Sequence, residues 1–386
     1  MRQQTLLNHI TGIIAGFDFS VPLHLYLKNY FRQHKQLGSR DRKIISSGCY
    51  AYYRCALLMP NKSFDEQLAL SFSITNETNL LSEYLFEKYG ITKKESNCLS
   101  DRLGLIQQQG GITPDEAFLF LDLLSDKIDK KAFTESLFQQ PLVWIRLKKK
   151  NKKSVLDELK LKEITPVKSI SNALGFAPAT ALTTLESYTK GCFEIQDLSS
   201  QQTLSLLPGN CGQRMWDCCS GSGGKTLLLA DRFPKASFLL TDLRTSSLQN
   251  AEARLNKTAF RNYKTLQADL TAELNLGEKF NVIIADVPCS GSGTWSRTPE
   301  NFWNFDKKII KDYTELQLTI AKNATKHLNN NGMFLYLTCS AFADENEVNV
   351  KRIAKQCNLN IVEQTLFHGY KHQSDTMFSC LMKLNG

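Results

Sequence analysis

The 386-residue chain carries a formal net charge of +9 at pH 7, which suits a polyanionic partner, and its length predicts two or three domains. Its 11 cysteines include no C-x-x-C pair and do not cluster with its 6 histidines, which argues against a zinc ribbon, another metal site or a disulfide framework. The N-terminus lacks a basic stretch followed by an apolar segment, and no apolar run reaches 18 residues, so we expect no signal peptide, no membrane span and a cytoplasmic location.

Residues 1–138 have the apolar spacing of α-helices. Apolar residues recur three and four positions apart over 6–14 and again over 44–53. The first 50 residues also hold seven Lys or Arg against two Asp or Glu. We therefore predict an N-terminal helical domain. Two interpretations of it stay open: an RNA-binding domain resembling the NusB type, or a structural cap on the rest of the protein.

Residues 139–205 predict a small α+β connector. A strand-like alternation over 142–146 is followed by a helical segment over 153–161. Between them, residues 148–153 contain five lysines in six positions. Such a run is often only a solvated face, but its place directly after a strand favours an edge or loop that faces RNA.

Residues 206–386 alternate strand-like and helix-like segments, which predicts a mostly parallel sheet. The strand at 214–219 leads into a glycine-rich turn at 220–226 and then into a helix. Glycines permit a tight turn and a close approach of the backbone to a ligand. The turn ends Gly-Lys-Thr like a phosphate-binding loop, but Cys219 stands where that motif requires glycine, which disfavours an ATPase or GTPase. Further along, a predicted helix over 314–328 precedes the run Asn-Asn-Asn-Gly at 329–332.

Two acids follow the next two predicted strands. Asp242 ends the strand-like segment 236–241, and an acid at this position of a strand–turn–helix–strand unit commonly binds ribose hydroxyls. Asp269 follows a third strand-like segment at 263–267. An acid at a strand end is often just a cap, so the case for Asp269 depends on its place beside the other elements.

Two cysteine-containing turns, Asp286-Val287-Pro288-Cys289 and Thr338-Cys339-Ser340, each follow an apolar run that predicts a buried strand. Ligands of open α/β sheets sit at the carboxyl ends of the strands, so the two thiols can meet at one substrate. A thiolate that adds to a ring carbon and is later eliminated needs such a set of thiols with a nearby acid.

These segments resemble the Sun/Fmu (Nop/Sun) family of S-adenosylmethionine-dependent RNA cytosine-5 methyltransferases. The family pattern D-x-C-A-A-P-G-G-K-T aligns with residues 217–226, and D-A-P-C-S-G-T-G aligns with 286–293. R-x-x-P-D-x-x-W aligns with 297–303, and Y-S-T-C-S followed by E-x-E aligns with 336–347. The resemblance covers about residues 140–386. It is closest to the bacterial small-subunit ribosomal RNA methyltransferases, because a long helical segment also precedes the match.

The chain departs from the family pattern at a few positions. Ser222 replaces the proline of the glycine-rich turn, and Gly221 replaces an alanine. Residues 374–378 stand where the family has D-G-F-F. These changes bear on the affinity for the cofactor and leave both cysteine-containing turns intact.

The resemblance implies a Rossmann-like S-adenosylmethionine-dependent methyltransferase domain at 206–386, preceded by an RNA-binding connector at 139–205 and the helical domain at 1–138. It implies that Cys339 attacks carbon 6 of the cytosine and that Cys289 assists product release, whereas DNA cytosine-5 enzymes attack with the Pro-Cys thiol. Asp286 would hydrogen-bond to the ring nitrogen. Asp242 would bind the ribose and Asp269 the adenine of the cofactor. The implied cofactor-binding residues are Cys219, Ser220, Gly221, Ser222, Gly223, Gly224, Lys225, Asp242, Asp269 and Asp286.

By the same resemblance the partner is RNA, with small-subunit ribosomal RNA ahead of transfer RNA, and we expect a monomer. The target base must be looped or flipped out, because a base inside a duplex cannot be reached. Two other functions were weighed. An exocyclic-amine methyltransferase would need an aromatic residue where Cys289 stands. A catalytically silent RNA binder of ribosome assembly could lose either thiol, and both are present.

Overall fold

The computed structural model describes residues 2–92 and 98–385. The chain forms two compact units, each described here by itself. The first consists of Met1–Asp122, Asp129–Gln140 and Trp295–Asp306, and the second of Leu123–Ile128, Pro141–Thr294 and Lys307–Gly386. The division of the chain into three parts, at 138/139 and 205/206, stays a prediction.

The first unit is helical, as the apolar spacing of its sequence predicts. Leu6, Ile10 and Ile13 of α1 and Ile45 of α3 are buried in one core. The helix α4 begins with a capping box, in which the backbone N–H of Ser63 donates to the Glu66 carboxylate. The elements of this unit are α1 (Arg2–Gly16), α2 (Leu23–Gln33), α3 (Ser39–Cys55), η1 (Ala56–Leu58), α4 (Phe64–Thr75), α5 (Leu80–Tyr89), α6 (Leu99–Gln108), α7 (Pro114–Ala117), α8 (Lys130–Leu137) and α14 (Glu300–Trp303).

The segment Trp295–Asp306 belongs to this helical unit, although it lies between two strands of the second unit in the sequence. The indole N–H of Trp303 donates to the Tyr53 carbonyl oxygen at 2.5 Å. Arg54, buried at the end of α3, donates to the Ser296 carbonyl oxygen at 2.9 Å. The helical unit therefore has a core to which two distant parts of the chain contribute.

The second unit holds a small antiparallel sheet with the order β2-β3-β1-β4 among the described residues. Its apolar core joins the sheet to the helix that follows β1, with Ile145 and Val155 fully buried. Its elements are β1 (Val143–Leu147), η2 (Lys149–Asn151), α9 (Lys152–Leu161), β2 (Lys168–Ile170), β3 (Ala173–Phe176), η3 (Leu182–Thr184), α10 (Glu186–Thr189) and β4 (Phe193–Ile195).

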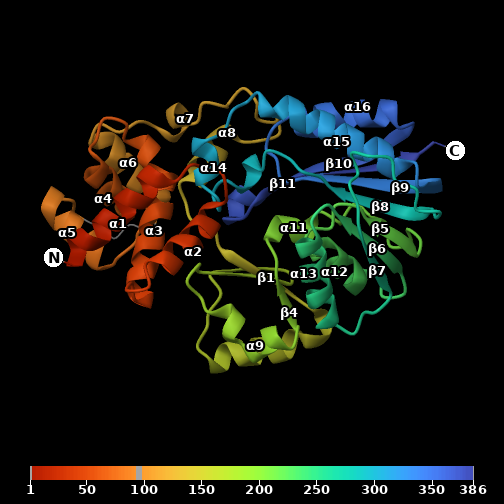
Figure 1. Cartoon of the computed structure of the whole chain (residues 1–386), viewed down its shortest axis with the longest axis horizontal. Helices are drawn as coiled ribbons and strands as arrows, with labels where there is room; N and C mark the ends of the chain where they lie inside the picture. The colour runs from red at the N-terminus through yellow and green to blue at the C-terminus, as the bar shows by residue number, and fades with distance from the viewer. Residues whose placement is uncertain (1, 93–97, 386) are drawn as a thin grey trace. The chain divides into compact units, whose positions relative to one another are not determined.

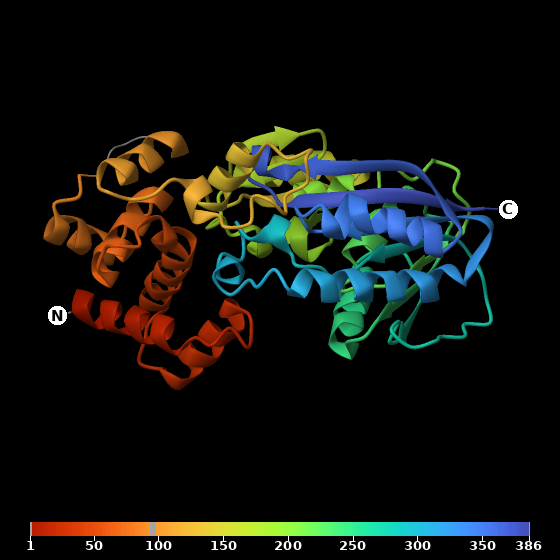
Figure 2. The ribbon, with the colours of Figure 1, turned by 90° about the horizontal axis from the view of Figure 1, so that it is seen from above.

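The same unit holds the main sheet, whose described strands have the order β10-β11-β9-β8-β5-β6-β7. The pairs from β9 to β7 are parallel, and β10 and β11 add an antiparallel edge. Figure 1 shows α12 and α13 on one face of the sheet and α15 and α16 on the other, and Figure 2 shows the long edge pair in dark blue. This confirms the predicted Rossmann-like fold.

The main sheet is built and covered by the remaining helices and strands of this unit. They are α11 (Leu198–Gln202), β5 (Arg214–Asp217), α12 (Gly224–Arg232), β6 (Ser237–Asp242), α13 (Thr245–Asn256), β7 (Tyr263–Gln267), β8 (Phe280–Asp286), η4 (Ser292–Thr294), α15 (Ile309–Thr325), β9 (Leu328–Thr338), η5 (Asp344–Val348), α16 (Asn349–Gln356), β10 (Leu359–His368), η6 (Gly369–His372) and β11 (Thr376–Leu384). The predicted helix over 314–328 is wrong at its end, because α15 stops at Thr325 and Leu328 begins β9. The pairing of β9 with β8 is irregular there, and Asn331 takes a left-handed φ of 60°.

The order of the strands in the main sheet indicates where a ligand would bind. From β5 the chain proceeds to β6 and β7 on one side, and β8 and β9 lie on the other side. The carboxyl end of β5 is therefore the point at which the strand order reverses, which is where open α/β sheets bind ligands. The glycine-rich turn follows β5 at this point.

Candidate active site

The two cysteine-containing turns meet at the carboxyl ends of neighbouring strands. Asp286 of β8 is paired in register with Leu337 of β9, so Cys289 and Cys339 leave the sheet at the same edge. Their Sγ atoms lie 3.3 Å apart, and both side chains are half-buried. This short distance between the sulfurs is what the sequence prediction requires, namely that both thiols can reach one substrate.

Gly293 allows this approach. A Cβ at this position would lie 2.1 Å from the Thr376 carbonyl oxygen and 2.8 Å from that of Cys339. The Gly293 N–H donates to the same Cys339 oxygen at 2.9 Å. Any side chain here would therefore push the loop that follows Cys289 away from the other turn.

Glu345 ties the two turns together, and sequence reasoning gave it no role. The carboxylate is fully buried. Its Oε1 accepts from the Ser290 N–H at 2.8 Å, and its Oε2 accepts from the Ser290 and Ser340 hydroxyls at 2.5 and 2.6 Å. Gln317 of α15 donates to Oε1 at 3.2 Å. Each serine directly follows one of the two cysteines, so a single carboxylate fixes the spacing of both. The only signal in the sequence was the acidic stretch of the family resemblance.

The contact between the two thiols affects the titration of Cys289. The hydrogen bond with Cys339, burial and the nearby Glu345 carboxylate raise the pKa of Cys289 well above its ordinary value. Because the largest cause is the hydrogen bond between the two thiols, this effect belongs to the pair of sulfurs and assigns no separate role to either one.

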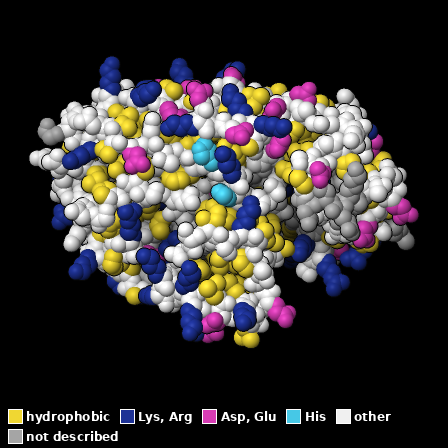
Figure 3. Space-filling view, turned by 180° about the vertical axis from the view of Figure 1, so that it is seen from behind, with side chains coloured by type: hydrophobic (Ala, Val, Ile, Leu, Met, Phe, Trp, Pro, Cys, Tyr) yellow, Lys and Arg dark blue, Asp and Glu magenta, His cyan; other side chains and the backbone are white. Residues whose placement is uncertain are grey.

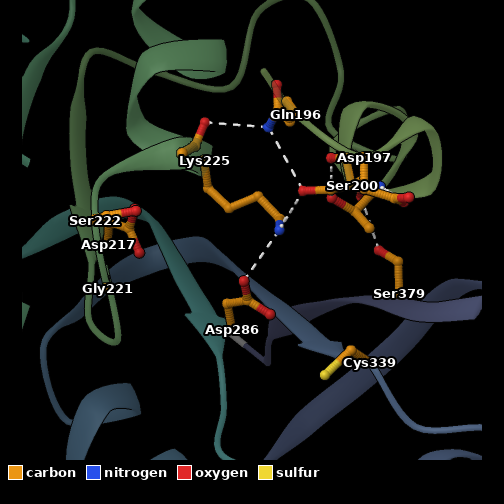
Figure 4. Close-up of polar contacts among 12 residues, drawn as sticks. Gln196, Asp197, Ser200, Asp217, Gly221, Ser222, Lys225, Asp286, Cys339 and Ser379 are labelled. Carbon is orange, nitrogen blue, oxygen red and sulfur yellow. Dashed lines mark hydrogen bonds and ion pairs between the residues drawn. The ribbon is translucent and has the colours of Figure 1, made fainter. Parts of the chain in front are cut away.

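Asp286 forms an ion pair with Lys225, 3.0 Å from its Nζ to the carboxylate Oδ2. Lys225 also donates to the Ser200 hydroxyl at 2.9 Å, which links α12 to α11. In Figure 4 the Asp286 carboxylate lies between the Lys225 amine and Cys339. The Lys225 amine therefore stands as a hydrogen-bond donor beside the Asp286 carboxylate.

The glycine-rich turn leaves space and hydrogen-bonding groups for a ligand. Gly221 and Gly223 take left-handed φ values of 51° and 75°. A Cβ on Gly221 would meet no atom within 4 Å, so the turn opens onto free space there. The Gly221 N–H donates to Asp242 Oδ2 at 2.9 Å, which brings the predicted ribose ligand against the turn. Ser222, in place of the family proline, accepts a hydrogen bond from Arg254 of α13 at 3.1 Å.

Two buried polar atoms beside this turn have no hydrogen-bond partner among the described residues: Asp217 Oδ1 and Ser220 Oγ. Asp217 is fully buried at the end of β5, and its other oxygen accepts from Thr226 at 2.7 Å. Burial raises the pKa of Asp217 to about 7. Unsatisfied buried groups beside an open turn are typical of a ligand site. The set of acceptors fits the amino and hydroxyl groups of S-adenosylmethionine.

Asp269 lies apart from these contacts. It is exposed after β7, and its carboxylate accepts from the Thr271 N–H and hydroxyl at 2.8 and 2.7 Å. These hydrogen bonds lower the pKa of Asp269. The neighbouring Ala268 N–H donates to the Asp242 carbonyl oxygen at 3.2 Å, so the segment itself runs beside the predicted ribose ligand. The adenine-binding role of Asp269 stays a prediction.

Within the described part of the chain, no group of three or more His, Cys, Asp or Glu residues could hold a metal ion. The helices described were also too short or too polar to cross a membrane.

Residues 203–381 match the family model described as 16S rRNA methyltransferase RsmB/F. Among curated proteins, the ribosomal RNA small subunit methyltransferase B of Enterobacter sp. (strain 638) is 26% identical over 255 residues, covering 63% of this chain and 59% of the relative. That of Serratia proteamaculans is 28% identical over 233 residues, covering 58% and 54%. The chain thus spans a little over half the length of the curated relatives it matches.

Two solved structures share the fold. The crystal structure of PH0851 superposes with a TM-score of 0.74 at 16% identity and covers 98% of both chains. NSun6 from Pyrococcus horikoshii, crystallised with the S-adenosylmethionine analogue SFG, has a TM-score of 0.59 at 18% identity and covers 67% of this chain and 95% of that one. At these identities the likeness concerns the fold alone.

Proposed function

Because residues 203–381 belong to the 16S rRNA methyltransferase RsmB/F family, whose members depend on S-adenosylmethionine, we propose that this chain methylates carbon 5 of a cytosine in RNA through a covalent Cys–cytosine intermediate. The observation that carries the proposal is the 3.3 Å contact between Cys289 and Cys339 beside Asp286. The names of the relatives favour small-subunit ribosomal RNA as the substrate.

S-adenosylmethionine supplies an electrophilic methyl group when it is bound. The residues that would hold it are those of the open turn, Gly221 to Lys225, together with Asp242. The turn would present its backbone N–H groups and the start of α12 to the methionine end. The Asp242 carboxylate, already fixed by the Gly221 N–H, would accept from the ribose hydroxyls.

Carbon 5 of cytosine is a poor nucleophile until carbon 6 has been attacked. In the proposed reaction the Cys339 thiolate forms an S–C6 bond, and the ring electrons move toward the ring nitrogen and carbon 5. The Asp286–Lys225 pair would stabilise the charge at the ring nitrogen, because Lys225 Nζ supplies a proton donor 3.0 Å from the carboxylate. Carbon 5 then takes the methyl group.

Product release requires loss of the carbon-5 proton and cleavage of the S–C6 bond. Cys289 is the candidate for this step, because it lies against the Cys339 sulfur. For this step the Cys289 sulfur would take the carbon-5 proton as a thiolate, while the S–C6 electron pair returns to the Cys339 sulfur.

The test is bisulfite sequencing of total RNA from a strain that lacks the protein, compared with the parent strain. We expect at least one methylated cytosine, in small-subunit ribosomal RNA, to become unmethylated and to return when the gene is restored. An unchanged pattern of methylated cytosines in every RNA would contradict the proposal.

A further inference from the structure

A second cleft in the unit that holds both sheets lies away from the cysteine pair. It has a volume of about 930 Å³ and is lined by the end of β1, by α11, by the later part of α12 and by the loop after α13. The helix α12 begins at the glycine-rich turn and leads away from it. At 1.5 Å per residue, Asp231 in the cleft lies about 9 Å along the helix from Lys225 of the candidate active site. The cleft also reaches back along α12 to Leu227, two residues from Lys225, so it borders the candidate active site.

The cleft is strongly basic. Its described lining contains seven Lys or Arg side chains against a single acid, Asp231. They come from four places in the sequence that are distant from one another. The basic residues are Arg146, Lys148, Lys149, Lys150, Lys190, Arg232 and Lys257. The space-filling view of Figure 3 shows Lys and Arg side chains spread over one face of the protein.

Some of these charges have a structural role. Arg232 donates to the Leu204 and Leu207 carbonyl oxygens. Lys148, which is buried, lies 3.7 Å from Glu194. The lysine run at 148–153 is therefore not one solvated face, because its first member is part of the packed unit.

Lys149 and Lys150 have no such role. Both are exposed on η2, and neither side chain makes an ion pair or a hydrogen bond with the residues that the structure describes. Both line the cleft. Two like charges placed side by side repel one another and give no stability to the fold. Their position is explained if a polyanion enters the cleft.

Arg146 supplies a second, independent observation. Its side chain is only 8% exposed, and its Nε and Nη1 are engaged by Gln196 and Asp231. Its Nη2, however, has no hydrogen-bond partner among the described residues. A buried guanidinium normally has all its donors paired, because leaving one unpaired is costly. Arginine also suits phosphate, which it can bind with two parallel hydrogen bonds.

We infer that this cleft anchors the sugar-phosphate backbone of the RNA substrate, with phosphodiester groups at Lys149, Lys150 and Arg146. The identity of the polyanion as RNA rests on the proposed function. The cleft offers many cations and only one aromatic side chain, Phe260, so it is built to hold a backbone and not to read bases. α11 links it to the active site, since Gln201 lines the cleft and the preceding Ser200 bonds Lys225.

The test compares the salt dependence of RNA binding for the wild-type protein and the double variant Lys149→Gln/Lys150→Gln, without methyl donor. The RNA is a transcript of the small-subunit ribosomal RNA segment identified by bisulfite sequencing, or of the whole RNA if none is identified. If the double variant loses two phosphate contacts, the slope of log affinity against log salt should fall in magnitude by about 1.4. This figure assumes about 0.7 for each phosphate of single-stranded RNA that the protein neutralises.

Lys351→Gln/Lys355→Gln is the matched control, because it removes the same charge from exposed positions of α16 outside the cleft. It should keep the wild-type slope. An equal fall in both double variants would overturn the inference, since net charge alone would then explain it. An unchanged slope in Lys149→Gln/Lys150→Gln would also overturn it, and the cleft would be a solvated face.

A second arm distinguishes a backbone from a free nucleotide. Adenosine monophosphate is titrated against the RNA complex at fixed salt. If it displaces the RNA at micromolar concentration, and does so only when Lys149 and Lys150 are present, the cleft binds a mononucleotide and the inference fails. Failure of the proposed function would look different: cytosine methylation would be unchanged in the deletion strain while the binding slopes still differed.

Discussion

The Sγ atoms of Cys289 and Cys339 lie 3.3 Å apart, although 50 residues separate the two cysteines in the chain. The parallel pairing of β8 with β9 ends both strands at one edge, and Glu345 holds the turns that follow. Because the thiols are so close, a pyrimidine attacked by one lies within reach of the other. Their roles can therefore be separated by removing them one at a time.

Cys339→Ala should abolish methylation and leave no covalent RNA adduct, because no thiolate attacks carbon 6. Cys289→Ala should still attack and methylate, but should stall before elimination and accumulate an adduct. Denaturing gel electrophoresis of the protein with labelled RNA measures both. An adduct with Cys339→Ala and none with Cys289→Ala would reverse the two roles, and full activity of both variants would make the thiols structural.

Glu345→Ala should abolish methyl transfer, because it leaves the buried donors of Ser290 and Ser340 without an acceptor at about 1–3 kcal/mol each. Glu345→Gln keeps an acceptor and removes the negative charge, which contributes to the raised pKa of Cys289. In Glu345→Gln the Cys289 thiol should therefore be alkylated by iodoacetamide at a lower pH than in the wild type, as followed by peptide mass spectrometry.

Glu347→Gln is the matched control for this experiment. Its carboxylate is two residues away and accepts from Ser125, not from the cysteine-containing turns. It should leave the alkylation profile of Cys289 unchanged. If both variants shift the profile equally, Glu345 has no special part in holding the site.

Asp242→Ala should weaken binding of S-adenosylmethionine by about 1–3 kcal/mol, because the ribose hydroxyls lose their acceptor and the Gly221 N–H loses its partner. Asp269→Ala should also weaken it if Asp269 reaches the adenine. Calorimetry measures both affinities, with Asp157→Ala on α9 as the control carboxylate. Wild-type affinity in Asp242→Ala would remove Asp242 from the cofactor site.

Asp217→Asn should change how stability depends on pH. Burial raises the pKa of Asp217 to about 7, so between about pH 4 and pH 7 the folded protein binds a proton that the unfolded chain has lost. Wild-type stability from this group is thus highest at low pH and falls as pH rises through this window, by on the order of 4 kcal/mol. Asn lacks this dependence and keeps an acceptor for Thr226.

Thermal unfolding at pH 5 and pH 8 measures the effect of Asp217→Asn. The melting temperature of the variant, relative to that of the wild type, should be higher at pH 8 than at pH 5 in the absence of cofactor. An equal difference between the two proteins at both pH values would mean that Asp217 titrates in its ordinary range.

The features that could be predicted from the sequence are those set by the local pattern of apolar and polar residues. The alternation of apolar strands and helices placed Cys289, Cys339 and Asp242 at strand ends, because parallel strands end at a common edge. The role of Glu345 could not be predicted, since it depends on which side chain the turn after β9 buries. The place of Asn331 inside β9 could not be predicted, because asparagine and glycine favour loops and the pairing with β8 skips residues 329–332.

The segment Trp295–Asp306 makes the helical unit a discontinuous domain. Its indole and phenyl rings complete a core whose other members come from the first 140 residues, with Trp295 and Phe302 both buried. One cut in the chain therefore cannot release either unit intact. A fragment that begins after residue 140 would expose the apolar side chains of Trp295–Asp306, which would favour self-association. Transferring the helical unit to another enzyme would require moving two separate pieces of sequence together.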